Sequence, residues 1–186
     1  MLNLEKGAKL DLKKEDGTPV TEMRFGGGWD AVEEGADIDG DLFAFDEAGN
    51  VTYFNDKTGI AGTELDEDNL TGEDKPGEEG TADENIAFNT ALMTSKKVVI
   101  AINIYKAAER NQDFSKVKEL FVEIEDTTNK KMIGEHKISG NESATGKDVL
   151  VVGTIEKTDA GLTFTGIYEY DNGDIEAIAA KYKPTV

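Results

Sequence analysis

The sequence predicts a mainly β protein: a two-sheet β-sandwich with short helices, one of them at the C-terminus. Short segments in which apolar and polar residues alternate recur along the chain, and clusters of Gly, Asn, Asp and Thr separate them. Helical spacing of apolar residues is confined to two short stretches. Repeated short strands with little helix are typical of sandwiches and barrels. Without an internal repeat or a Pro/Ser-rich linker, one domain over residues 1–186 is expected.

The sequence predicts strands along most of the chain and a helix at its C-terminus. In 97–105, valine and isoleucine occupy both alternating faces, which is typical of a central strand buried on both sides. In 174–182, Ile175, Ile178 and Ala179 share one helical face, and Asp174 suits the positive start of that helix. Further strands are expected at 42–45, 119–125, 130–138, 149–156 and 162–170, and one or two helical turns at 107–112. Gly26, Gly27 and Gly28 predict a sharp bend, a close approach of another group or an ordinary loop.

Charge and composition exclude several classes of protein. The formal net charge of -19, from 39 acidic and 20 basic residues, opposes contacts with nucleic-acid phosphates. No apolar run approaches the roughly 20 residues that span a bilayer, so integral membrane association is not expected and the protein is expected to be cytoplasmic. The chain has no Cys, which excludes disulfides and thiolate metal sites. An acidic surface is also explained by solubility alone, so the positions of the acidic residues say more about function than the net charge does.

Residues 61–85 form an acidic loop in which Lys75 is the only base. A hydrated, disordered segment is one explanation of this composition. The stretch 68–74, however, mixes carboxylate, amide and hydroxyl oxygens around Gly72, and Ca²⁺ prefers six to eight such oxygen ligands. Predicted strands flank the loop, so it is not an EF-hand. Asp37 and Asp39 place alternate carboxylates at the entry to the strand at 42–45, from where they are expected to complete a site across the fold.

Several motifs, in order, resemble the TerD family, named for bacterial tellurite resistance. The Asp-Asn-x-Thr-Gly of the acidic loop is the most specific of them, and the similarity covers nearly the whole chain. The matching pieces are Leu4-Glu5-Lys6-Gly7, Gly28-Trp29-Asp30, Asp37-Ile38-Asp39, Tyr53-Phe54-Asn55, Asp68-Asn69-Leu70-Thr71-Gly72-Glu73, Asp83-Glu84-Asn85-Ile86 and the segment 111–117.

The resemblance implies a two-sheet β fold that binds Ca²⁺ through this loop and nearby carboxylates, without known enzymatic chemistry. It also implies a role in stress response or tellurite resistance. Departures at Glu67, at Gly40-Asp41, in the longer stretch 74–82 and at 162–164 mark a divergent member. The leading ligands by this resemblance are Asp30, Asp68, Asn69, Thr71, Asp83 and Glu84, and the second group is Asp37, Asp39, Glu73 and Asp74.

Other functions have less support in the residues. Paired carboxylates of a glycosidase sit in a cleft with aromatic platforms, and no aromatic residue interleaves the acidic loop. His136 is the single histidine and is expected to be a half-exposed strand residue, while Trp29 is expected to be structural. The alternative to a calcium-binding stress protein is a structural or interaction protein of a larger assembly, such as a stress-response complex or a virus particle, in which Ca²⁺ only stabilises the fold.

Overall fold

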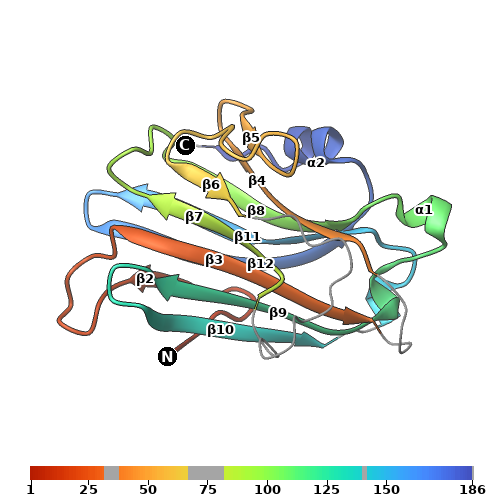
Figure 1. Cartoon of the computed structure of the whole chain (residues 1–186), viewed down its shortest axis with the longest axis horizontal. Helices are drawn as coiled ribbons and strands as arrows, with labels where there is room; N and C mark the ends of the chain where they lie inside the picture. Colours follow the sequence, from red (N-terminus) through yellow and green to blue (C-terminus); the bar gives the residue numbers. More distant parts are fainter. Residues whose placement is uncertain (32–37, 67–81, 140–141, 186) are drawn as a thin grey trace.

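Two six-stranded sheets lie one in front of the other in the computed structural model, which describes residues 1–31, 38–66, 82–139 and 142–185 (Figure 1). The strand order is β1-β10-β9-β3-β7-β6 in the first sheet and β2-β12-β11-β8-β4-β5 in the second. The two-sheet, mainly β fold with a short C-terminal helix is confirmed. Within these ranges no helix is long and apolar enough to cross a bilayer.

The strands vary from two to eleven residues, and each helix is short. Pairing between neighbours is antiparallel except between β1 and β10, which run parallel. The strands are β1 (Leu2–Asn3), β2 (Lys9–Leu12), β3 (Glu22–Ala31), β4 (Gly40–Asp46), β5 (Val51–Thr52), β6 (Thr63–Leu65), β7 (Glu84–Asn89), β8 (Lys97–Ile104), β9 (Val117–Asp126), β10 (Lys131–Ser139), β11 (Val149–Thr158) and β12 (Gly161–Asp171); the helices are α1 (Ala107–Arg110) and α2 (Ile175–Lys181), with 3-10 turns η1 (Phe114–Lys116) and η2 (Glu142–Ala144).

Strand β8 is buried on both faces, as its sequence predicts. It lies inside the second sheet, between β11 and β4. Ile100 and Ile102 face the core between the sheets, while Val99 and Ala101 belong to a second, smaller core on the outer face. Helix α2 covers this outer core, and its Ile178 is 1% exposed. A strand with apolar residues on both faces therefore reflects two cores, one between the sheets and one under a helix.

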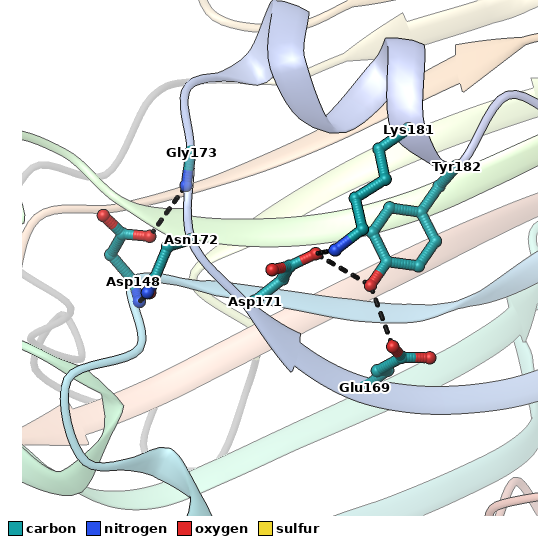
Figure 2. Close-up of polar contacts among 7 residues, drawn as sticks. All are labelled: Asp148, Glu169, Asp171, Asn172, Gly173, Lys181 and Tyr182. Carbon is teal, nitrogen blue, oxygen red and sulfur yellow. Dashed lines mark hydrogen bonds and ion pairs between the residues drawn. The ribbon is translucent and has the colours of Figure 1, made fainter.

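The C-terminal helix is capped at its start and fixed to the second sheet at its end. At its start, the Asp174 carboxylate accepts a hydrogen bond of 2.8 Å from the Ala177 amide, which confirms the predicted N-terminal residue. At its end, the Tyr182 hydroxyl lies 2.9 Å from Asp171 Oδ2 and 3.1 Å from Glu169 Oε1, so the two carboxylates share its one proton, and Lys181 pairs with Asp171 (Figure 2). The hydrogen bond from Lys181 holds the pKa of the Asp171 carboxyl below its usual value.

The loop before α2 is tied to the start of β11. Asp148 accepts a hydrogen bond from the Gly173 amide at 3.2 Å, and its own amide donates to the Asn172 side chain at 3.2 Å (Figure 2). Gly173 has a φ of 144°, which side chains disfavour. Asp148 therefore holds the connection between β12 and α2 at both Asn172 and Gly173. Only a short segment links α2 to the sheet that it covers.

The three successive glycines lie inside strand β3, where other groups approach closely. A Cβ at Gly28 would lie 2.3 Å from the Phe121 ring, which crosses β3 from the neighbouring strand β9. A Cβ at Gly26 would lie 2.6 Å from the Ala82 side chain and 3.0 Å from that of Glu123. Close approach is thus the correct interpretation of these glycines, and the ordinary-loop alternative is wrong.

Replacing Ile178 with Ala is expected to lower the free energy of unfolding by about 2–4 kcal/mol, because the change leaves a cavity beneath α2. Chemical denaturation monitored by circular dichroism measures this loss. Ala180 lies on the exposed side of the same helix. Ala180→Ser is the matched control and should change stability by less than about 0.5 kcal/mol. Equal effects of the two changes would show that α2 does not pack on the sheet.

Replacing Glu123 with Gln is expected to stabilise the protein at neutral pH. Burial raises the pKa of the Glu123 carboxyl, Arg24 opposes the shift, and Glu125 and Glu135 add to it. Since the folded state has the higher pKa, the ionised carboxylate is a penalty that is present above this pKa and disappears as pH falls through it. Thermal melting should show Tm higher by roughly 1–3 °C at pH 7 and no difference near pH 4. The exposed Glu64→Gln is the control and should show no such pH dependence.

Candidate functional site

The two described ends of the acidic loop are held together by one pair of residues. The Asn85 backbone amide donates to Asp66 Oδ1 at 2.9 Å, and its side-chain amide donates to Asp66 Oδ2 at 2.9 Å. In return, the Asp66 amide donates to the Asn85 carbonyl at 3.0 Å. These bonds fix the base of the loop against strand β7. The predicted ligands inside the loop and before β4 lie outside the described residues: Asp37, Asp68, Asn69, Thr71, Glu73 and Asp74.

Asp83 stands where the pairing between β7 and β3 ends. The pairing reaches Gly27 opposite Glu84, and β3 continues beyond it. The Asp83 amide donates to the Gly27 carbonyl at 2.9 Å, and the Asp83 carboxylate accepts from the Trp29 amide at 2.7 Å. The Asp83 side-chain oxygen thus accepts the hydrogen bond of the Trp29 amide that a carbonyl of a neighbouring strand would otherwise have accepted. The predicted ligand Asp83 therefore also has a structural role.

Glu84 connects the two sheets. Its side chain projects from β7 of the first sheet and is 0% exposed. Glu84 Oε2 accepts a hydrogen bond of 2.6 Å from the Leu42 amide on β4 of the second sheet. The bond contacts the peptide that joins Asp41 to Leu42 in β4. A buried carboxylate needs such hydrogen bonds to remain charged away from water.

Asp39 and Asp41 lie at the start of β4 and are both buried, at 4% and 3% exposure. Asp39 Oδ2 pairs with Arg110 Nη1 at 2.9 Å, and the Asp39 carbonyl accepts from the Tyr105 amide at 2.7 Å. Asp41 lies opposite Asn103 on β8. Of the two carboxylates predicted at this strand entry, Asp39 is buried and Asp37 lies outside the described residues.

Asp30 lies near the end of β3. It is exposed and stands opposite Glu119 of β9. Its neighbour Trp29 points the other way, into the core, and is 2% exposed. Successive side chains of a strand alternate between its faces. The structure thus brings Asp39, Asp83 and Glu84 to one end of the sandwich and turns Asp30 to the outer face of the first sheet.

Trp29 connects β3 with the entry to β4. Its indole Nε1 donates to the Ile38 carbonyl at 3.0 Å, and its ring lies over Gly40. A Cβ at Gly40 would lie 2.6 Å from this ring. Gly40 is thus needed for close packing, and the prediction of a structural Trp29 is confirmed. His136, on β10, is half-buried as expected, with its Nδ1 3.3 Å from the Asn3 side chain.

The chemistry of this end of the sandwich suits a hard cation. Its side chains offer carboxylate oxygens, which Ca²⁺ and Mg²⁺ prefer, and no sulfur. Within the described ranges, no three acidic or histidine residues form a group that would hold a metal ion by themselves. Sequence reasoning identified the carboxylates and missed Arg110 and Asn85. Arg110 lies in no matching motif, and Asn85 lies in one without being a predicted ligand; the roles of both depend on long-range contacts.

Replacing Gly40 with Ala is expected to displace the Trp29 ring and lower the free energy of unfolding by about 1–3 kcal/mol. Thermal melting measures the loss, and tryptophan fluorescence reports the ring directly because Trp29 is the single tryptophan. At Gly49, a Cβ would meet no atom of the described residues within 4 Å, but φ is 91°, so Gly49→Asn is the appropriate control. An unchanged emission spectrum in Gly40→Ala would contradict the close packing.

Comparisons with known proteins give a relative, two related folds and a family. The chain is 26% identical over 204 residues to the stress response protein SCP2 of Bacillus subtilis (strain 168), covering 97% of this chain and 98% of that protein. Two crystal structures share the fold: SAV2460, of unknown function (TM-score 0.64, 17% identity, 87% and 96% of the two chains), and SCO6318 of Streptomyces coelicolor A3(2), a homologue of telluride resistance protein TerD (TM-score 0.62, 14% identity, 86% and 95%). The TerD domain model matches residues 1–182, and the chain belongs to the TerD domain family.

Proposed function

We propose that the protein is a non-enzymatic, calcium-binding member of the TerD family that acts in the stress response in the cytoplasm. The ion would be held where the acidic loop meets the sandwich, with Asp83, Glu84 and Asp39 contributing from the described part of the chain. The observation that carries the proposal is the burial of three carboxylates there: Asp39, Asp41 and Glu84 are at most 4% exposed. A buried carboxylate is costly without a counter-charge, and a divalent cation would supply one.

The charge of the whole chain supports the same proposal. With a net charge of -19, the protein attracts cations and raises their local concentration. The Asp66–Asn85 hydrogen bonds hold the base of the acidic loop in place, so that oxygen ligands from 67–81 would be presented from a fixed frame. A role in stress response rests on the name of the Bacillus subtilis relative. The absence of Cys fits a reducing compartment such as the cytoplasm.

A non-enzymatic role is supported by what the carboxylates contact. Asp83 and Glu84 accept backbone amides, and Asp39 pairs with a guanidinium. Each of these interactions stabilises the ionised carboxylate. A general acid must give a proton to a substrate, whereas these carboxylates accept hydrogen bonds or an ion pair from the chain itself. Holding an ion, by contrast, requires ionised oxygen ligands.

Calcium is expected to raise the melting temperature of the chelator-treated protein and to give a saturable heat on calorimetric titration. At about 100 times Kd, ligand binding adds roughly 2.7 kcal/mol to the free energy of unfolding. The double change Asp68→Ala, Asp83→Ala should abolish both effects, because it removes two of the proposed ligands. Circular dichroism should confirm that the double variant keeps its strands at low temperature.

The matched control is Glu22→Ala, Asp159→Ala, which removes the same charge from exposed positions at the far ends of β3 and β11. It should bind calcium like the parent protein. If the parent gives no heat and no shift of Tm in millimolar calcium, the proposed function is wrong. If the Asp68→Ala, Asp83→Ala protein binds as the parent does, the ligand assignment is wrong.

A further inference from the structure

Asn172 is the only asparagine of the chain that precedes a glycine. In such a dipeptide the backbone nitrogen of the glycine attacks the side-chain carbonyl carbon of the asparagine, because no side chain on the glycine shields that nitrogen. A bond forms between this nitrogen and Cγ, ammonia leaves with the amide proton, and a cyclic imide remains. Water then opens the imide at either carbonyl and gives aspartate or isoaspartate. The pair Asn172-Gly173 therefore has the composition of a deamidation site.

The dipeptide lies in the short connection between strand β12 and helix α2. The strand ends at Asp171 and the helix begins at Ile175. Asn172 is exposed, so water reaches its side chain. Gly173 has a φ of 144°, a conformation that residues with a side chain rarely adopt. A change of charge or of backbone length at this position acts directly on the segment that joins α2 to its sheet.

Asp148 contacts both groups that would have to react. Its carboxylate accepts a hydrogen bond of 3.2 Å from the Gly173 amide, and its own amide donates one of 3.2 Å to Asn172 Oδ1 (Figure 2). The first bond opposes the reaction, because loss of the Gly173 proton would place a second negative charge beside the carboxylate. The second bond restricts the rotation of the Asn172 side chain that ring closure needs. Asp148 thus protects the dipeptide while both bonds are made.

These two contacts are weak enough to open. Both distances are at the long end of the usual range for N–H···O hydrogen bonds. The Asp148 amide is also shared, since it lies 3.3 Å from the Asp171 carbonyl. The Asp148 carbonyl, by contrast, accepts from the Ile104 amide of β8 at 2.9 Å, which holds Asp148 in the sheet. Local opening therefore moves Asn172 and Gly173 away from an Asp148 that stays in place.

Helix α2 holds the connection from its other side. Ile178 packs on the outer core, and the Tyr182 hydroxyl lies 2.9 Å from Asp171. A helix of seven residues is not stable by itself in water, so α2 depends on these contacts. When α2 detaches, the connection is released from Asp148 and the outer core, with Phe43 and Phe45, becomes accessible to water. Detachment of α2 and exposure of the reactive dipeptide are one event.

We propose that Asn172 is a deamidation site that Asp148 protects, and that the reaction makes a temporary detachment of α2 permanent. The product has a carboxylate at position 172 in place of a neutral amide, and the carboxylates of Asp148 and Asp171 repel it. In the isoaspartate product the main chain also runs through the former side chain, which lengthens the connection by one carbon atom. Both products oppose the closed arrangement. The inference does not depend on calcium binding.

Incubation of the folded protein at neutral pH for several days, followed by tryptic mapping with mass spectrometry, measures the reaction. The tryptic peptide 158–181 is suited to this because Asn172 is its only side-chain amide. The same peptide, incubated after its release from the protein, gives the unprotected rate. Deamidation in the folded protein is expected to be at least about tenfold slower, because the reaction must first break a hydrogen bond to a charged group.

Variants separate the role of Asp148 from that of α2. Asp148→Ala removes the carboxylate and should accelerate deamidation about tenfold, and Asp148→Asn, which keeps an acceptor without the charge, should lie between it and the parent. Ile178→Ala loosens α2 without changing Asp148 and should also accelerate the reaction. The matched control is Glu176→Ala, which removes a carboxylate from the exposed first turn of α2 and should stay within about twofold of the parent.

Hydrogen exchange on the separated deamidated protein tests the consequence. Exchange should be faster in α2 than in the unmodified protein and unchanged in β3. Equal rates in the folded parent and in the released peptide would show that the fold does not protect Asn172. If Asp148→Ala reacts no faster than Glu176→Ala, Asp148 is not the protecting group. Unchanged exchange in α2 after deamidation would show that the helix docks again. Each of these three results overturns the proposal.

Discussion

The hydrogen bond between Glu84 and the Leu42 amide is the contact on which this end of the sandwich depends. It is the point at which a charged side chain of the first sheet reaches the backbone of the second. Because Glu84 is fully buried, the bond replaces water that the carboxylate lost on folding. Removing the amide partner would leave a buried charge, which is far more costly than losing an exposed one. The two sheets are therefore joined at β7 and β4 by a polar contact, as they are at β6 and β5 by the buried hydrogen bond between the Thr63 and Thr52 hydroxyls.

Two other carboxylates near this contact, those of Asp83 and Asp39, are stabilised by different partners. The Asp83 carboxylate accepts a hydrogen bond from the Trp29 amide, and the Asp39 carboxylate forms an ion pair with the Arg110 guanidinium. Trp29 in turn donates its indole N–H to the Ile38 carbonyl, next to Asp39 in the sequence. The contacts form one connected set that joins β3, β4, β7 and α1. Such a set stabilises one arrangement of the chain more strongly than isolated pairs do.

The strands and the C-terminal helix were predictable because they depend on local patterns. Alternation in β8 and helical spacing with Asp174 in α2 are properties of short stretches of sequence. The roles of Glu84 and Arg110 were not predictable in this way. Glu84 belongs by composition to the acidic loop, yet its partner lies 42 positions away. Arg110 lies in a short helical stretch, and nothing in that stretch indicates a partner 71 positions earlier, since 110 minus 39 is 71. Residue types identified the acidic candidates, whereas their partners follow from the packing of the sheets.

The acidic loop is attached to this network on both sides, which affects how any ion would bind. Asp66 is held by Asn85, and Asp83 by the backbone of β3. A ligand that joins a preformed frame has less chain to order, so more of its interaction energy appears as affinity. The same contacts also neutralise part of the charge that would attract the ion. Affinity then depends on how the two effects balance: a rigid, acidic base favours binding, and each resident hydrogen bond opposes it. The net charge of the chain is thus a weaker guide to cation binding than the partners of these few buried carboxylates.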